Sequence, residues 1–446
     1  MFLTLKSRRP ALFSRSAMAV SLALGVVGGG FVAATPALAA KQSAPKMSPE
    51  FQKVVIPLNQ AVEAAKKRAD VVAAKGNAAT LGSLLAAEKA QLDQAFAAIS
   101  TPDDRLVFGQ VAVGLGGLAE DPAIQRRGIQ AMLESGKANP ADVPRLQFFA
   151  GSLAYQARDY GAARTALQAA ITSGYRDNDA EALLAEAYMA DNQAAQGLNI
   201  LMQAIEARRA TGTPAPENWY RRGLGAAYKA KLLDQVANFS LGLVQAYPST
   251  ANWGGAITIV REIGRFPAQE TLDLMRLMAR TSSYGEERDY IEYIQAADAR
   301  RLPGEVQKVI EAGVASGKLR ASDQFVAEAR TISNERIAAD RASLVGLERD
   351  ARAANATAAT AAGAGDAFLS YGDAAKAEAL YTIALAKPGV DTARVLTRLG
   401  IAQVDLGKAA EAKASFDKVD GPRQPIARLW AIYAAQKAGG ADVAPR

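Results

Sequence analysis

A recurring pattern of small and large residues constrains the fold of this chain more than any other feature of its sequence. A small residue is followed four positions later by a large one, and three positions after that by a small or β-branched one. The pattern is filled by Ala163, Leu167 and Ala170, then by Gly197, Leu201 and Ala204, and then by Ala237, Leu241 and Val244. The first step between copies is 34 residues and the second is 40. A period in this range indicates a tandem repeat of one supersecondary unit.

The pattern returns near the C-terminus, where the step is 35 residues. There Gly365, Phe368, Gly372, Ala377, Tyr381 and Ala384 correspond to Gly400, Gln403, Gly407, Ala412, Phe416 and Val419. Around these copies, apolar residues recur at three- and four-residue spacing, which is typical of amphipathic helices. Alternating β-branched runs closed by tight-turn dipeptides, the signal of strands, do not recur. The sequence therefore predicts an all-α fold.

The repeated residues resemble the tetratricopeptide repeat (TPR), a helix–turn–helix unit of about 34 residues. The resemblance covers 144–248 and 358–422, and from Trp253 to Gly317 the helical spacing persists while the motif is degenerate. It implies a right-handed α-solenoid of TPR-like helical hairpins. In such hairpins, small residues let the two helices approach closely.

Three expected contacts follow from that packing: Ala185 with Gly197, Gly225 with Ala237, and Gly400 with Ala412. The turn at Tyr371-Gly372-Asp373 carries a further signal. Gly372 can take the left-handed conformation that ends a helix, and Asp373 can cap the start of the next one.

The same patterns divide the chain into five parts. They are a signal peptide at 1–39, an N-terminal helical, TPR-like region at 40–143, a TPR-like solenoid with a degenerate C-terminal part at 144–320, a charged helical connector at 321–355, and a C-terminal TPR pair with a capping helix at 356–446. The last helix, Pro425–Lys437, carries Trp430 and Tyr433. A solenoid needs a cap on its open end, so we expect this helix to provide it.

The first part has the three regions of a secretory signal peptide. Four bases and no acid within residues 1–16 precede an apolar run from Ala17 to about Ala34, and Ala37-Leu38-Ala39 supplies the small residues of a cleavage site. We expect cleavage after Ala39 or Ala40, and a periplasmic or secreted protein without an integral membrane segment. A membrane anchor is the weaker interpretation, because the run contains four glycines and barely reaches a spanning length. Sec and twin-arginine export both stay open.

Cleavage removes most of the excess positive charge. The whole chain has 52 Lys and Arg against 45 Asp and Glu, a net charge of +7, and the four bases of the signal peptide leave +3. The dense basic stripe of a nucleic-acid-binding protein is missing. The chain also has no cysteine and no histidine, which excludes disulfides, thiol nucleophiles, a Ser-His-Asp triad and an ordinary zinc site. We predict no catalytic residue, no metal and no cofactor.

Three short motifs imitate ligand sites. Gly114–Ala119 looks like a dinucleotide-binding turn, but the residues downstream continue a helical pattern where a second strand is needed. Gly313–Lys318 resembles a phosphate loop that is one residue short, with Leu319 where a magnesium-binding hydroxyl should stand. Several acids between Gly285 and Glu292 gather at an expected helix start, where the helix dipole favours them. We interpret all three motifs as features of helix packing and helix ends.

The leading functional hypothesis is a non-catalytic scaffold that binds a protein or peptide partner, with cell-envelope assembly as one such role. In stacked TPR hairpins the first helices line an inner wall that holds extended peptides or helices. The residues predicted for this candidate partner groove are Phe149, Glu186, Trp219, Arg222, Lys229, Arg394 and Arg398.

Two other functions compete with it. A cell-wall enzyme of the lytic-transglycosylase type would carry a catalytic Glu-Ser near a Gly-Leu-Met-Gln stretch. The only Glu-Ser here is Glu134-Ser135, and no such stretch is present. A polysaccharide-assembly factor is neither supported nor excluded by the spacing of the aromatic residues.

Overall fold

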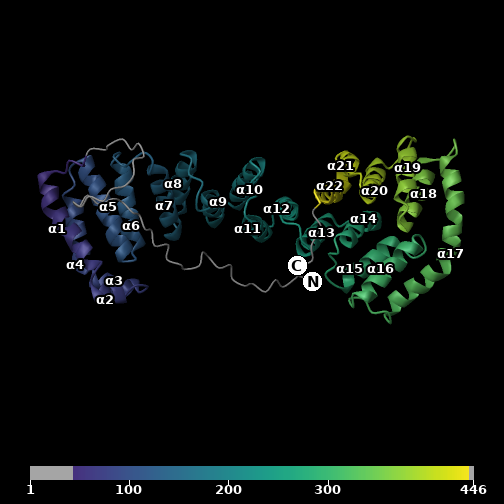
Figure 1. Cartoon of the computed structure of the whole chain (residues 1–446), viewed down its shortest axis with the longest axis horizontal. Helices are drawn as coiled ribbons and strands as arrows, with labels where there is room; N and C mark the ends of the chain where they lie inside the picture. The colour runs from purple at the N-terminus through teal and green to yellow at the C-terminus, as the bar shows by residue number, and fades with distance from the viewer. Residues whose placement is uncertain (1–43, 441–446) are drawn as a thin grey trace. The chain divides into compact units, whose positions relative to one another are not determined.

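The computed structural model describes residues 44–440, so the predicted signal peptide lies outside the described residues. Every regular element within that range is a helix (Figure 1). The chain divides into two compact units, unit 1 ending at Leu201 and unit 2 beginning at Met202. The boundary falls inside helix α10, in the middle of the region that the sequence patterns treat as one continuous solenoid.

Unit 1 contains nine complete helices among its described residues. They are α1 Pro49–Ala65, α2 Ala69–Ala73, α3 Ala78–Leu84, α4 Ala86–Ala97, α5 Pro102–Leu118, α6 Pro122–Glu134, α7 Val143–Gln156, α8 Tyr160–Thr172 and α9 Ala180–Ala190, followed by α10 Ala194–Ala210 across the boundary. Neighbouring helices pack as antiparallel hairpins, most extensively α5 with α6 and α7 with α8.

Unit 2 continues with further hairpins and one long helix. Its elements are α11 Glu217–Lys229, α12 Leu233–Ala246, α13 Thr250–Gly264, α14 Ala268–Arg280, α15 Glu287–Ala297, α16 Pro303–Ala315, α17 Gln324–Arg352, α18 Ala358–Tyr371, α19 Ala374–Leu385, α20 Thr392–Asp405, α21 Ala409–Phe416, the 3-10 turn η1 Gly421–Arg423 and α22 Gln424–Ala438. Helix α17, 29 residues long, spans most of the segment predicted as a charged helical connector. The architecture is an all-α solenoid of TPR-like hairpins.

In four hairpins, a glycine on the first helix contacts a large side chain on the second helix, 16 positions further along the chain. The pairs are Gly151 with Leu167, Gly223 with Phe239, Gly365 with Tyr381, and Gly400 with Phe416. A Cβ atom added to Gly223 would lie 2.2 Å from the Phe239 ring, and one added to Gly400 would lie 2.5 Å from the Phe416 ring. Any residue larger than glycine at these positions would overpack the crossing.

One of the three contacts expected from the sequence is confirmed. A Cβ added to Gly197 would lie 2.5 Å from the carbonyl oxygen of Ala185, so these two helices do meet at small residues. Gly400 does lie at a helix crossing, where the ring of Phe416 is its nearest neighbour.

The expected contact of Gly225 with Ala237 is wrong. Gly225 faces open space, and Gly223 is the residue at the crossing with α12. The sequence match was therefore two residues out of register in this copy, because Leu224-Gly225-x-x-Tyr228 imitates the motif. Tyr228 is 60% exposed, so the imitating residues lie on a solvent-exposed face of α11.

The turn chemistry is confirmed. Gly372 ends α18 with a φ of 87°, in the left-handed region that suits glycine. Asp373 then caps α19, and its carboxylate accepts a 3.1 Å hydrogen bond from the Lys376 amide. The three imitated ligand motifs are also helical features. Gly114–Ala119 lies at the end of α5, Gly313–Lys318 at the end of α16, and the acids after Gly285 form a capping box at the start of α15.

The C-terminal helix α22 packs on α21, the second helix of the last hairpin, and also against earlier helices of its own unit. Helices α13 and α14 both contact it, and Figure 1 shows it in yellow beside them. The Trp430 indole donates a 2.9 Å hydrogen bond to the carbonyl oxygen of Asp273 on α14. The Tyr433 ring meets Trp253 edge-on. Helix α22 therefore covers the last hairpin and also contacts α12–α14, and its capping role stays a prediction.

Candidate functional site

The seven residues predicted for the partner groove belong to both units. Phe149 and Glu186 lie on α7 and α9 of unit 1 and are half-buried, while the other five lie in unit 2. On α11, Lys229 is exposed and Arg222 is half-buried. Two of the residues cannot line a groove at all.

Trp219 is 0% exposed, and the guanidinium of Arg208 covers its ring at 4.5 Å from the centroid. It fills the α11 hairpin four residues before the crossing glycine, Gly223, so its assignment to an exposed wall is wrong. Arg398 is also 0% exposed. Its neighbour on the helix, Arg394, keeps 26% of its side-chain surface.

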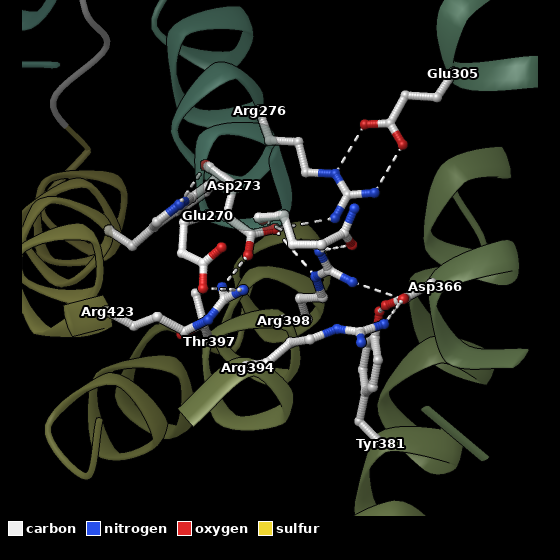
Figure 2. Close-up of polar contacts among 12 residues, drawn as sticks. Glu270, Asp273, Arg276, Glu305, Asp366, Tyr381, Arg394, Thr397, Arg398 and Arg423 are labelled. Carbon is white, nitrogen blue, oxygen red and sulfur yellow. Dashed lines mark hydrogen bonds and ion pairs between the residues drawn. The ribbon is translucent and has the colours of Figure 1, made fainter. Parts of the chain in front are cut away.

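Arg398 lies in a buried ion network at the junction of α14, α18 and α20 (Figure 2). Its guanidinium donates to Asp273 at 3.1 Å and to Asp366 at 2.6 Å. It also donates to the side-chain oxygen of Gln269 at 3.0 Å. A guanidinium buried to this degree is stable only when its donors are paired in this way. Arg394 and Arg398 were predicted to bind a partner, but both form ion pairs with acids of the chain itself.

Two further arginines extend the network to α16 and η1. Arg276 makes a two-pronged contact with Glu305, with distances of 2.8 and 2.7 Å. Arg423 donates to the second oxygen of Asp273 at 2.6 Å and lies 3.3 Å from Glu270. Figure 2 shows these contacts around Asp273. Four arginines thus meet four acids, namely Arg276, Arg394, Arg398 and Arg423 with Glu270, Asp273, Glu305 and Asp366.

Charge and burial oppose each other in the pKa values of this network. Burial acts to raise the pKa of Asp366, but the charges of Arg398 and Arg394 outweigh it and lower that pKa to about 2. Burial likewise acts against ionisation of Glu305, yet Arg276 brings its pKa below the usual value. The pKa of Tyr381, which donates to Asp366 at 2.8 Å, is raised by burial and by that carboxylate. Asp366 and Glu305 are therefore ionised at neutral pH, and the network holds α14, α16, α18 and α20 together.

A groove of about 870 Å³ lies elsewhere in unit 2, between two sets of helices. One wall comes from the end of α10, the loop after it, α11 and α12, and the other from the end of α21 and from α22. This volume is typical of ligand-binding clefts. Its apolar lining includes Met202, Ile205, Leu241, Ala427, Ala431 and Ile432. Its charged lining consists of Glu206, Arg209, Asp417 and Arg428.

Helix α22 forms the second wall of this groove because its other face is anchored. Arg423, just before the helix, joins the ion network, and Trp430 bonds to α14. The side chain of Gln436 donates a 2.8 Å hydrogen bond to the carbonyl oxygen of Val244 on α12. The residues that line the groove recur at the three- and four-residue spacing of the opposite helix face. The fold-back of the C-terminal repeats therefore creates the groove.

Sequence reasoning missed this groove. It placed the binding wall on first helices of successive hairpins, whereas the groove joins helices about 200 positions apart in the chain. The apolar residues of α22 were assigned to a cap. One local feature of α22 indicated the groove. Arg428 is a charged residue among the apolar residues Ala427, Ala431 and Ile432 on one face of the helix.

Within residues 44–440, no helix is long and apolar enough to cross a membrane, and no group of acids is arranged to hold a metal ion.

No family model matches the chain, and no curated protein matches it. Among solved structures, one similar chain occurs in "Structure of Naa15/Naa10 bound to HypK-THB". It is 14% identical, the alignment covers 88% of this chain and 70% of that chain, and the TM-score is 0.35. A similarity at this level does not indicate a function.

Proposed function

We propose that the protein is an exported, non-catalytic TPR-like scaffold, and that it holds a segment of a partner protein in the groove of unit 2. The observation that carries the proposal is the groove itself, with apolar residues along its lining and charged residues among them. That mixture is typical of surfaces that bind proteins, where an apolar centre supplies the affinity and polar groups fix the orientation.

Export is part of the same proposal and rests on residues 1–39. We propose a periplasmic or secreted location, with a role in assembly of the cell envelope. N-terminal sequencing of the protein from an envelope fraction should give Ala40 or Lys41 as the first residue. Recovery of the uncleaved chain from the cytoplasm would rule export out.

Site-specific photocrosslinking tests the groove. A photoreactive amino acid replaces Leu241 or Ile432 in the full chain, and in a control it replaces Val345, which is 77% exposed on α17 and not part of the groove. Crosslinking in intact cells should give a discrete adduct from the groove positions and none from the control. An Ala431→Trp substitution, which fills the groove, should abolish the adduct. Identical adducts from all three positions would contradict the proposal.

A further inference from the structure

The charged residues of the groove differ in whether the chain already satisfies them. Asp417 forms a 2.5 Å ion pair with Lys413. Arg209 donates only to the amide oxygen of Gln245, at 3.1 Å. Within the described residues Arg428 has no ion pair and no hydrogen bond, and Glu206 has none either. The groove therefore holds two arginines without a carboxylate partner and one carboxylate without a cation.

The two arginines come from opposite walls of the groove. Arg209 lies in the last turn of α10, and Arg428 lies in the first half of α22. Apolar residues of both walls, including Leu241 and Ile432, line the same groove. A guanidinium in a partly apolar cleft binds a carboxylate through parallel hydrogen bonds, and it does so more strongly than in open water. The charge pattern therefore favours an acidic group at the centre of the occupant.

We infer that the groove binds a peptide segment that combines apolar side chains with one or more Asp or Glu residues, which pair with Arg209 and Arg428. The inference rests on the proposed function, since it names the chemistry of the partner for the same site. Glu206 lies one turn before Arg209 on α10 and determines in which direction the segment binds. Its carboxylate pairs with a basic side chain or accepts a hydrogen bond from a backbone amide at one end of the segment. The site differs from a peptide clamp on successive first helices, because its second wall is formed by α21 and α22, which fold back toward α10–α12.

A random peptide library displayed on phage, selected on the full chain, provides the probe. We expect enriched peptides in which Asp or Glu stands among apolar residues. Arg428→Glu should weaken their binding by about tenfold or more, because an attraction becomes a repulsion. Arg336→Glu is the matched control, since Arg336 is exposed on α17 in the same unit but lies outside the groove; it should leave binding unchanged. Exchanging the acid of a selected peptide for Lys should restore binding to the Arg428→Glu variant.

Each other result has a distinct meaning. Selected peptides that lack acids, or acidic peptides that bind the wild type and Arg428→Glu equally, would overturn the inference while leaving a peptide groove in place. Peptide binding that Ala431→Trp does not reduce would refute the groove as a binding site, and the inference would fall with the proposed function. Trp fluorescence of each variant checks that unit 2 is folded, because Trp219, Trp253 and Trp430 are all buried there.

Discussion

Ion pairs organise the two units of this chain in different ways. In unit 1 they join neighbouring helices and are partly exposed, as in Lys89 with Asp121 and Arg127 with Asp93, which are 32 and 34 positions apart. In unit 2 the pairs around Asp273 are buried and join residues 125 and 150 positions apart. The same kind of hairpin is thus used in two ways. In unit 1 the ion pairs named here join helices close in the sequence, and in unit 2 they join helices from distant repeats.

The buried apolar residues show the same contrast. In unit 1 they form separate clusters, such as one that runs from Phe51 to Ala131 and another from Phe148 to Ala187. In unit 2 one cluster extends from Val244 to Ala434, while buried residues of α11 and α12 such as Trp219 and Phe239 lie outside it. Repeat proteins with only neighbour contacts lose stability locally, whereas long-range contacts couple distant helices. We therefore expect α13–α22 of unit 2 to unfold as one body and unit 1 to unfold in parts.

The largest expected effect comes from breaking the buried network. Arg398→Met keeps a similar volume but leaves Asp273 and Asp366 buried without their shared partner. Removal of one member of a buried ion pair costs about 3–5 kcal/mol. Urea unfolding followed by Trp fluorescence, which reports unit 2 alone, should shift to lower urea. Hydrogen exchange of α5–α8 in unit 1 should not change. An unshifted Trp transition would show that the network does not hold unit 2 together.

An intermediate effect is expected on acidification. The pKa of Asp366 is lowered to about 2 in the folded protein, so its contribution is present above the pKa of the unfolded state, about 3.9, and is lost as the pH falls toward 2. The shift corresponds to roughly 2 kcal/mol. Protonation also leaves buried arginines without counter-charge. Trp fluorescence should therefore report loss of unit 2 structure between about pH 4 and pH 2.

Asp104 of unit 1 sharpens this test. Burial acts to raise its pKa, but hydrogen bonds from the backbone and hydroxyl of Ser48 and of Ser100 lower it to about 2. Its protonation leaves no unpaired cation behind. Hydrogen exchange after incubation at low pH should show a local loss of protection at α1 and α5 in unit 1, against loss throughout α14 and α18–α22 in unit 2. Equal and local losses in both would remove the distinction between the units.

The smallest effect is expected from a surface pair in unit 1. Arg126 pairs with Asp159 on the next hairpin, and both side chains are partly exposed. Such pairs contribute about 0–1 kcal/mol. Arg126→Met should move the urea transition followed by circular dichroism only slightly, with Trp fluorescence unaffected. A loss comparable to that of Arg398→Met would mean that exposed pairs hold unit 1 as strongly as buried ones hold unit 2.

The sequence predicted what is local. The helical hairpins, the turn at Gly372 and Asp373, and the charged connector α17 each depend on residues within one repeat, where spacing and caps carry the information. The register error at Gly225 shows the limit of that information, because two motif-like patterns overlap and only burial distinguishes them.

The fold-back and the groove could not be predicted for a physical reason. Arg394 and Arg398 stand at a spacing that marks one face of a helix, and charged residues on such a face are usually exposed. Their partners Asp273 and Asp366 lie in other repeats, and no pattern within α20 identifies them. Pairing a buried charge across 125 positions is a property of the folded unit, so sequence periodicity assigned these arginines to the surface.

The closed arrangement of unit 2 also limits how this chain can change its length. A stack of repeats held only by neighbours can gain or lose a hairpin by duplication or deletion, since each new repeat meets the same kind of surface on either side. Between α14 and α20 that freedom is lost. An added hairpin would displace Arg398 and Arg423 from Asp273, and these three buried charges would lose counterparts together. The number of repeats in unit 2 is therefore fixed by charge pairing, while in unit 1 it remains open to variation.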